Sequence, residues 1–186
     1  NTGQISLRAF RPPAAGPVAA YTFDQDNIIV LPEIDRMPIT NEIVFKIDEG
    51  EDGHANEIIC IDATSVSTYG RAGQHTIESK GLRTVLGAQW FCEEVANRLF
   101  ARFGGTPAGL KGGAPVARVE AFLSTLPVWV GDYVHVTHPL MPNLVTGELG
   151  VTERLYEVID REPDFARGRM RYRLLDTGLT GMAGAY

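Results

Sequence analysis

The pattern of apolar and polar residues predicts one long amphipathic helix over residues 81–103. Apolar side chains recur there every three or four positions, and charged or amide side chains occupy much of the remaining face. Gly104 and Gly105 can adopt the left-handed backbone that ends a helix, and Pro107 cannot extend one. The apolar residues of the expected stripe are Leu82, Val85, Leu86, Phe91, Val95, Leu99, Phe100 and Phe103.

The rest of the chain predicts short strands and turns. Residues 117–123 and 133–137 alternate between apolar and polar positions, as strands with one buried face do. Residues 151–160 and 168–175 predict an antiparallel pair, and residues 138–150 predict a long loop. We therefore expect an α+β fold that is mainly antiparallel β, similar to a split β-barrel, with one long amphipathic helix.

The expected domain division follows the glycine-rich segment that comes after the helix. Residues 1–115 would form an α+β subdomain, residues 116–180 an antiparallel β-barrel subdomain, and residues 181–186 a tail. A length of 186 residues with 44% hydrophobic content can bury a substantial core. Because the chain starts at Asn1, we expect it to be a fragment of a longer product.

Charge and cysteine content exclude several classes of protein. The net charge of −6 argues against general electrostatic binding to nucleic acid or anionic lipid. Cys60 and Cys92 are the two cysteines, and we expect two reduced, buried thiols instead of a disulfide framework. The sequence has no apolar run of about 18 residues, so we expect no membrane partner.

The acidic residues Asp48, Glu49, Glu51 and Asp52 form the clearest candidate for a metal site. They imitate part of an EF-hand calcium loop, but its twelfth position, which needs a bidentate glutamate, is Ile59. We therefore interpret this segment as a solvated loop between two strands.

The histidines and the glycine-rich segment give no better site. His135 and His138 are three residues apart in a predicted strand, so their side chains should lie on opposite faces. His54 and His75 have no second ligand at the spacing that zinc requires. Lys111 is not followed by the Ser or Thr of a phosphate-binding loop. We expect no catalytic residue, no cofactor and no metal.

Three segments in a fixed order resemble a known family. Residues 62–71 (DATSVSTYGR) continue through residues 76–79 into the predicted helix. Residues 41–48 (NEIVFKID) are similar to the strand that enters this module, and residues 130–136 with residues 174–177 are similar to the barrel strands. Over about residues 21–179 the chain resembles the tail hub or baseplate hub proteins of tailed bacteriophages and of phage-derived particles such as gene transfer agents.

The resemblance implies a structural, non-enzymatic protein of the tail tip, made in the bacterial cytoplasm and built into the virion. Such a hub is a ring, typically a homotrimer, whose barrels imitate the sixfold symmetry of the tail tube. Its partners would be further copies of itself, a tail tube or distal tail protein, and a spike or fibre protein. DNA would meet it only as passing cargo.

A second hypothesis is a carbohydrate-binding or small enzymatic β-barrel, with Trp90, Trp129 and Tyr133 as a sugar platform. A core or interface role is favoured for such aromatic residues, because they dominate buried contacts in general. In a ring, exposed apolar residues of the C-terminal half would contact the neighbouring subunit. The residues that we expect at this interface are Val128, Trp129, Leu140, Met141 and Leu144.

Overall fold

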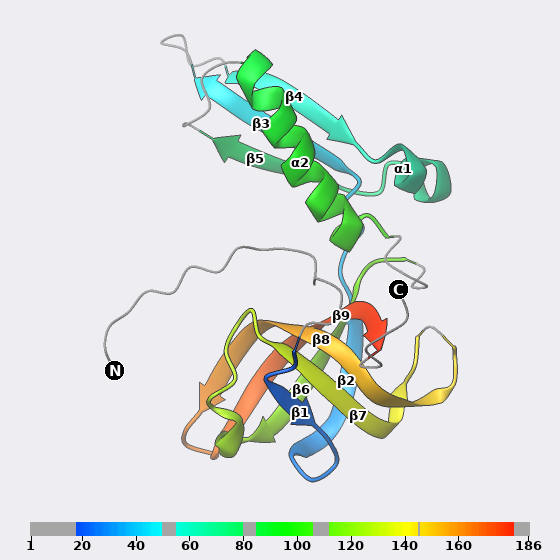
Figure 1. Cartoon of the computed structure of the whole chain (residues 1–186), viewed down its shortest axis with the longest axis vertical. Coiled ribbons are helices and arrows are strands. Elements are labelled where there is room, and N and C mark those ends of the chain that lie inside the picture. The colour runs from blue at the N-terminus through cyan, green and yellow to red at the C-terminus, as the bar shows by residue number, and fades with distance from the viewer. Residues whose placement is uncertain (1–17, 50–54, 80–84, 106–111, 145, 181–186) are drawn as a thin grey trace. The chain divides into compact units, whose positions relative to one another are not determined.

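The structure, a computed structural model, describes residues 18–49, 55–79, 85–105, 112–144 and 146–180 (Figure 1). The chain forms two compact units, and the α+β class expected from the sequence is confirmed. The first unit contains Asn1–Asp35 and Pro115–Tyr186, and the second contains Arg36–Ala114. The second unit is therefore inserted into the chain of the first, which differs from the expected division into residues 1–115 and 116–180.

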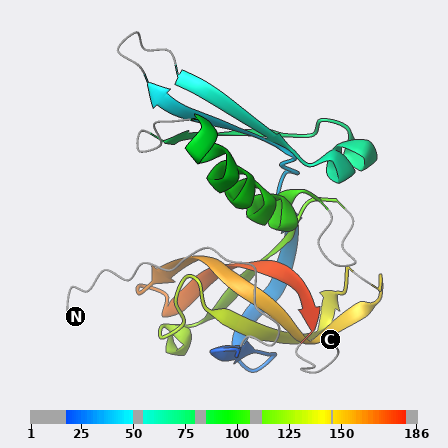
Figure 2. The ribbon, with the colours of Figure 1, turned by 45° about the horizontal axis from the view of Figure 1, so that its top comes forward.

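The first unit is a six-stranded sheet in the order β1-β7-β8-β9-β6-β2. Strand β1 runs parallel to β7, and the pairs β7–β8, β8–β9 and β6–β9 are antiparallel. Figures 1 and 2 show the sheet curling into a half-barrel. Its elements are β1 (Tyr21–Phe23), β2 (Ile28–Arg36), β6 (Pro115–Phe122), the short 3-10 helix η1 (Leu123–Thr125), β7 (Tyr133–Pro142), β8 (Leu149–Asp164) and β9 (Arg169–Thr180).

Alternating side chains build the core of the half-barrel. Val134 and Val136 of β7 are fully buried, and residues of the neighbouring strands enclose them. Phe23 packs its ring against Tyr172, with 5.2 Å between the ring centroids, which ties the short strand β1 to β9. The buried cluster consists of Phe23, Ile28, Ala117, Val119, Ala121, Val128, Val134, Val136, Met141, Val151, Tyr156, Val158, Met170, Tyr172 and Leu174.

The C-terminal strands were predicted in part. The antiparallel pair of β8 and β9 is confirmed, and both strands are longer than the pattern indicated. The prediction of a loop over residues 138–150 is wrong at both ends, because β7 continues to Pro142 and β8 begins at Leu149. Register shifts in the β7–β8 pair, between Val136 and His138 and again before Pro142, interrupt the alternation that would have revealed these strands.

The second unit is a three-stranded sheet in the order β4-β3-β5 with one long helix along one face (Figures 1 and 2). Strand β3 is antiparallel to β4 and parallel to β5. The segment between β4 and β5 forms a short helix that the apolar pattern did not predict. The elements are β3 (Glu42–Glu49), β4 (Ala55–Ile61), α1 (Ala63–Tyr69), β5 (Gln74–Ser79) and α2 (Val85–Phe103).

Helix α2 ends at Phe103, as predicted, and Gly105 has the positive φ of +83° that suits a helix terminus. Residues 81–84 of the expected helix lie outside the described residues. The prediction that Phe91 belongs to the buried stripe is wrong, because 47% of its surface is exposed. Phe100 of the expected stripe is buried against the sheet, and Val95 and Leu99 are partly buried beside it. The other buried side chains of α2 are small and lie one turn apart: Ala88, Cys92 and Ala96.

A buried amide holds the second unit together at the start of β3. The Asn41 side chain is fully buried, and its Nδ2 donates to Gly70 O at 2.7 Å and to Ser65 Oγ at 3.2 Å. Its Oδ1 accepts from the backbone N of Ala72 at 3.2 Å. Ser65 Oγ in turn donates to Gly104 O, beyond the end of α2. One side chain thus connects the start of β3 with α1 and, through Ser65, with the end of α2.

We expect Phe100→Ala to lower the free energy of unfolding by about 3 to 5 kcal/mol, because it empties a buried aromatic site. Phe91→Ala, the same substitution on an exposed face of the same helix, should cost less than about 1 kcal/mol. Urea denaturation of both variants measures the difference. Equal losses for the two variants would contradict the orientation of α2.

Candidate functional site

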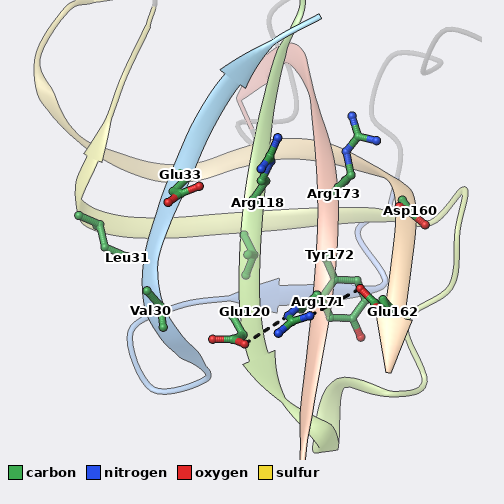
Figure 3. A pocket seen from close by; sticks show the side chains of 11 residues that line it. Val30, Leu31, Glu33, Arg118, Glu120, Asp160, Glu162, Arg171, Tyr172 and Arg173 are labelled. Atoms are coloured by element: carbon green, nitrogen blue, oxygen red, sulfur yellow. Dashed lines mark ion pairs between the residues drawn. The ribbon is translucent and has the colours of Figure 1, made fainter. Parts of the chain in front are cut away.

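An open groove of about 580 Å³ lies on the six-stranded sheet and crosses strands β2, β6, β9 and β8 (Figure 3). Strand β2 contributes Val30, Leu31 and Glu33, of which the first two are exposed apolar residues. The other strands contribute mainly charged side chains at alternate positions, which therefore share one face of the sheet. The remaining lining residues are Arg118, Val119, Glu120, Asp160, Glu162, Arg171, Tyr172 and Arg173.

One row of the groove is a ladder of opposite charges. Arg171 of β9 lies between Glu120 of β6 and Glu162 of β8 in the strand register, and Figure 3 shows both ion pairs. Arg171 Nε is 3.5 Å from Glu120 Oε1, and its Nη1 is 3.8 Å from Glu162 Oε2. Glu120 also accepts from Arg169 Nη1 at 3.1 Å. These side chains are partly solvated, so the ladder contributes little to stability and mainly fixes the charge pattern of the surface.

The neighbouring row places two arginines opposite each other. Arg118 of β6 and Arg173 of β9 are paired in the antiparallel register, an arrangement that costs free energy when both side chains are charged. Asp35 relieves part of this repulsion, because its Oδ2 accepts from Arg118 Nη2 at 3.2 Å. Asp160 of β8 stands opposite Arg173 in the register on the other side. The row is therefore mixed in charge and does not form a purely cationic site.

The groove presents a surface of mixed charge that is suited to binding. Its described lining contains carboxylates, guanidinium groups, apolar side chains and the phenol ring of Tyr172, but no serine, threonine, cysteine or histidine. Such a surface can pair with a protein segment of mixed charge, because each charged row presents both signs. Sequence analysis did not single out these residues. The alternation within the strands was visible, but the pairing that brings four strands together was not.

A second feature lies in the loop that leads into β7. The guanidinium carbon of Arg161 is 4.0 Å from the ring centroid of Trp129, a close cation–π contact. Arg161 Nη1 also donates to Val128 O at 2.8 Å and to Leu126 O at 3.1 Å, so its position is fixed. Arg161 thus stacks against the Trp129 ring, yet 58% of Trp129 remains exposed. This corner presents a rigid aromatic surface.

In the structure, some of the five residues expected at an interface are buried and the others reach the surface. Val128 and Met141 are enclosed in the core of the half-barrel, at 3% and 0% exposure. Trp129 and Leu140 are exposed, and Leu144 is partly exposed. The part of the expected interface that reaches the surface therefore consists of Trp129, Leu140 and Leu144. Of the alternative sugar platform, Trp90 belongs to the second unit, whereas Trp129 and Tyr133 belong to the first.

Both cysteines are free thiols within the core of the second unit, as predicted. Burial raises the pKa of the Cys60 thiol, and the nearby Cys92 and Glu93 raise it further. Burial also raises the pKa of Cys92, again with a contribution from Glu93. The thiolate forms are therefore disfavoured, and neither residue has the surroundings of a reactive cysteine.

The histidines occupy different environments in β7. His138 is buried with Val134 and Val136, and its Nδ1 accepts from the backbone N of Leu140 at 3.2 Å, whereas His135 is partly exposed. Within the residues that the structure describes, no three His, Cys, Asp or Glu side chains group as metal ligands would. Residues 50–54 and the side chains of Asp48 and Glu49 lie outside this description, and the calcium hypothesis with them. No described helix is long and apolar enough to cross a membrane.

A buried ion pair stands apart from the solvated ladder. Arg154 of β8 and Asp176 of β9 are 3% and 6% exposed, and Arg154 Nε lies 3.1 and 3.0 Å from the two carboxylate oxygens. Arg154 Nη2 is buried without a hydrogen-bond partner in the described structure. Burial raises the pKa of the adjacent Tyr156; Asp176 raises it further, and Arg154 opposes the shift. The pair fixes two strands, but it lies too deep to meet a ligand without rearrangement.

Comparison with known proteins gives similar structures at low identity. No protein-family model matches the sequence, and no curated protein matches it. A chain from the virion of a native gene transfer agent particle is 12% identical, with a TM-score of 0.49 over 86% of this chain and 32% of that chain. A tail protein from Neisseria meningitidis is 15% identical, with a TM-score of 0.44 over 93% of this chain and 49% of that chain.

A third similar structure is a prophage tail protein from Shewanella oneidensis, 15% identical, with a TM-score of 0.40. It is matched over 91% of this chain and 47% of its own length. The chain thus spans between about a third and a half of the structures that it matches. At these identities and scores the likeness does not place the chain in a family.

The two kinds of ion pair should differ sharply in a matched substitution. We expect Arg154→Ala to destabilise the protein by about 3 to 5 kcal/mol, because it removes the guanidinium group that faces the buried Asp176 carboxylate. Arg171→Ala should cost less than about 1 kcal/mol, because its ion pairs are partly solvated. Denaturant unfolding measures both values. A small effect for Arg154→Ala would show that water reaches Asp176.

The thiols should resist modification while the protein is folded. At about pH 8, an exposed thiol with an ordinary pKa of about 8.5 is partly ionised and reacts readily. Cys60 and Cys92 should react at least tenfold more slowly with a thiol reagent in the native protein than in urea, because the raised pKa and burial both oppose attack. Rapid labelling of the native protein would contradict the buried position of the thiols.

Proposed function

We propose that the chain is a structural component of a phage or phage-like tail, working as part of a tail-tip or baseplate hub. The finer proposal is a ring, most simply a homotrimer, that joins the tail tube to a spike or fibre. The class comes from the segments that resemble tail hub proteins. In the fold these segments form β3, α1 with its cap, β5, the start of β7 and part of β9.

The observation that carries an assembly role is the apolar surface that the half-barrel leaves exposed: Val30 and Leu31 line the groove, and Trp129 and Val130 are exposed ahead of β7. Exposed apolar surface is typical of sites that bind other proteins. In the second unit Trp90 and Phe91 are also exposed. The mixed charge of the walls of the groove agrees with a binding role, and we propose no catalytic activity for this chain.

Labelling of the chain in intact particles tests this proposal. An epitope tag on the chain, located by cryo-electron microscopy of purified particles, should appear on the tail axis beneath the last tube ring with threefold symmetry. A tag on the tail tube protein, which should decorate the tube along its length, is the control. Density on the capsid, or exclusion of the chain from particles, would overturn the proposal.

Two matched aromatic variants locate the proposed subunit contact. Trp129→Ala should reduce incorporation of the chain into particles at least tenfold, because exposed tryptophans are common anchors of protein interfaces. Phe165→Ala, which changes another exposed aromatic residue of the first unit, should leave incorporation within about twofold of normal, as substitutions outside an interface do. Equal incorporation of both variants would remove Trp129 from the contact.

A further inference from the structure

The edge strands of the two sheets differ in how well they are protected from pairing with another chain. Within the described residues, the edges of the six-stranded sheet are β1 and β2, and those of the three-stranded sheet are β4 and β5. Strand β1 has three residues, and β2 contains Pro32, which has no backbone N–H to donate. A short strand and a proline are both common devices that prevent an edge from pairing with another chain.

Strand β4 has neither of these devices. It runs over seven residues without proline or lysine, and its single charged residue is Glu57. In the described structure β4 pairs only with β3, so its outer backbone groups are left open. Ile59 and Ile61 are 55% and 44% exposed beside this open edge. The other edge of the sheet, β5, presents polar residues on the same face, with Thr76 next to Val44 in the register.

The two isoleucines lie on the face of the sheet that α2 does not cover. Cys60 and Ile58 of β4 belong to the cluster packed against α2, and strand residues alternate between faces. Ile59 and Ile61 therefore point to the opposite side. Ile59 pairs in register with Val44, and Glu57 pairs with Lys46 on this same face. An unpaired edge and an apolar strip thus run along the same strand.

We propose that β4 pairs antiparallel with β4 of a second copy of this chain, around a two-fold axis near Ile59. The two three-stranded sheets would join into one continuous sheet, with β4 and its symmetry copy at the centre. The two α2 helices would lie on the same face, and the isoleucines of both copies would form one strip on the other. Both open edges would be removed by the same contact.

The sequence of β4 is complementary to itself in this arrangement. With the axis at Ile59, the two Ile59 side chains stand opposite each other, and Glu57 stands opposite Ile61 of the second copy. Registers centred on Ile58 or Cys60 also keep the two Glu57 carboxylates apart. Like charges meet only if the axis passes through Glu57, so charge repulsion disfavours that register. Because Lys46 already stands beside Glu57, the pairing brings no uncompensated charge to the contact.

This inference does not rest on the proposed tail role. Because no two-fold axis relates the subunits of a threefold ring, the β4 contact would join copies from two separate rings. A strand from a different protein could also pair with β4, but a second copy offers an identical open edge, equal length and the same apolar strip at once. A head-to-tail pairing of β4 with β5 is the other homotypic arrangement. It would place Ile59 and Ile61 beside the polar residues of β5, and so would bury less apolar surface.

The test compares Ile59→Lys with Thr76→Lys in the 186-residue chain. Both residues are exposed on the same face of the same sheet, at opposite edges. Sedimentation equilibrium over a range of concentrations should show a dimer of the unmodified chain. Ile59→Lys should weaken its Kd at least tenfold, and Thr76→Lys should change it less than twofold. A chain that stays monomeric, or equal weakening by both variants, would overturn the proposal.

A cross-link provides a second measurement that does not depend on weakening the contact. Ile59→Cys should form a disulfide between two copies under mild oxidation, because residues directly opposite each other across paired strands are close enough to bond. Thr76→Cys is the matched control and should remain mostly unlinked. The native thiols, Cys60 and Cys92, are buried and should interfere little. Equal cross-linking at both positions, or none at Ile59→Cys, would contradict the two-fold pairing.

Discussion

The constraint on which the described fold depends is the pairing of two chain segments where the second unit begins and ends. Met37 N donates to Ala114 O at 2.9 Å, and Arg36 Nη1 donates to Gly113 O at 3.1 Å. A Cβ atom at Gly113 would overlap the carbonyl oxygen of Met37, so the close approach requires glycine there. The adjoining strands β2 and β6 are neighbours in the six-stranded sheet, so an entire unit is inserted without interrupting that sheet.

Within the second unit, the side chain of Asn41 likewise holds chain segments together by hydrogen bonds. The segments around α1 contain few apolar residues, so a hydrophobic core alone could not fix their positions. The fully buried amide satisfies backbone groups of Gly70 and Ala72 that would otherwise be left without partners. Asp62 caps α1 by accepting from the backbone N of Thr64 and Ser65. Polar groups therefore position this region, and the core of α2 and β3 stabilises it.

The sequence predicted those elements whose signal is local. Helix α2 and the β8–β9 pair have long, regular patterns, and both were found. Strand β5 and helix α1 were missed, because β5 is polar and mostly exposed and α1 is short and held by its cap. The parallel pairing of β1 with β7 joins residues more than a hundred positions apart, and no pattern within either strand specifies it.

The candidate sites could also be predicted only in part from the sequence, because they depend on how the strands pair. Arg118, Glu120 and Arg171 occupy outward positions that alternation identifies, but only the register reveals that they form one charged surface. The sequence predicts Met141 at a subunit interface, because methionine is enriched at interfaces. The irregular register of β7 with β8 turns its side chain into the core instead.

The distribution of charge separates structural from surface roles. Arg154 and Asp176 are taken out of water together, so their mutual attraction must compensate for lost hydration, and the pair fixes the alignment of β8 and β9. Arg171 and its partners keep part of their hydration and contribute little to folding. Arg118 and Arg173 stand opposite each other, which opposes folding, although Asp35 and Asp160 lie beside them. The charged rows of the groove therefore contribute little to the fold and mainly set the charge pattern of its surface.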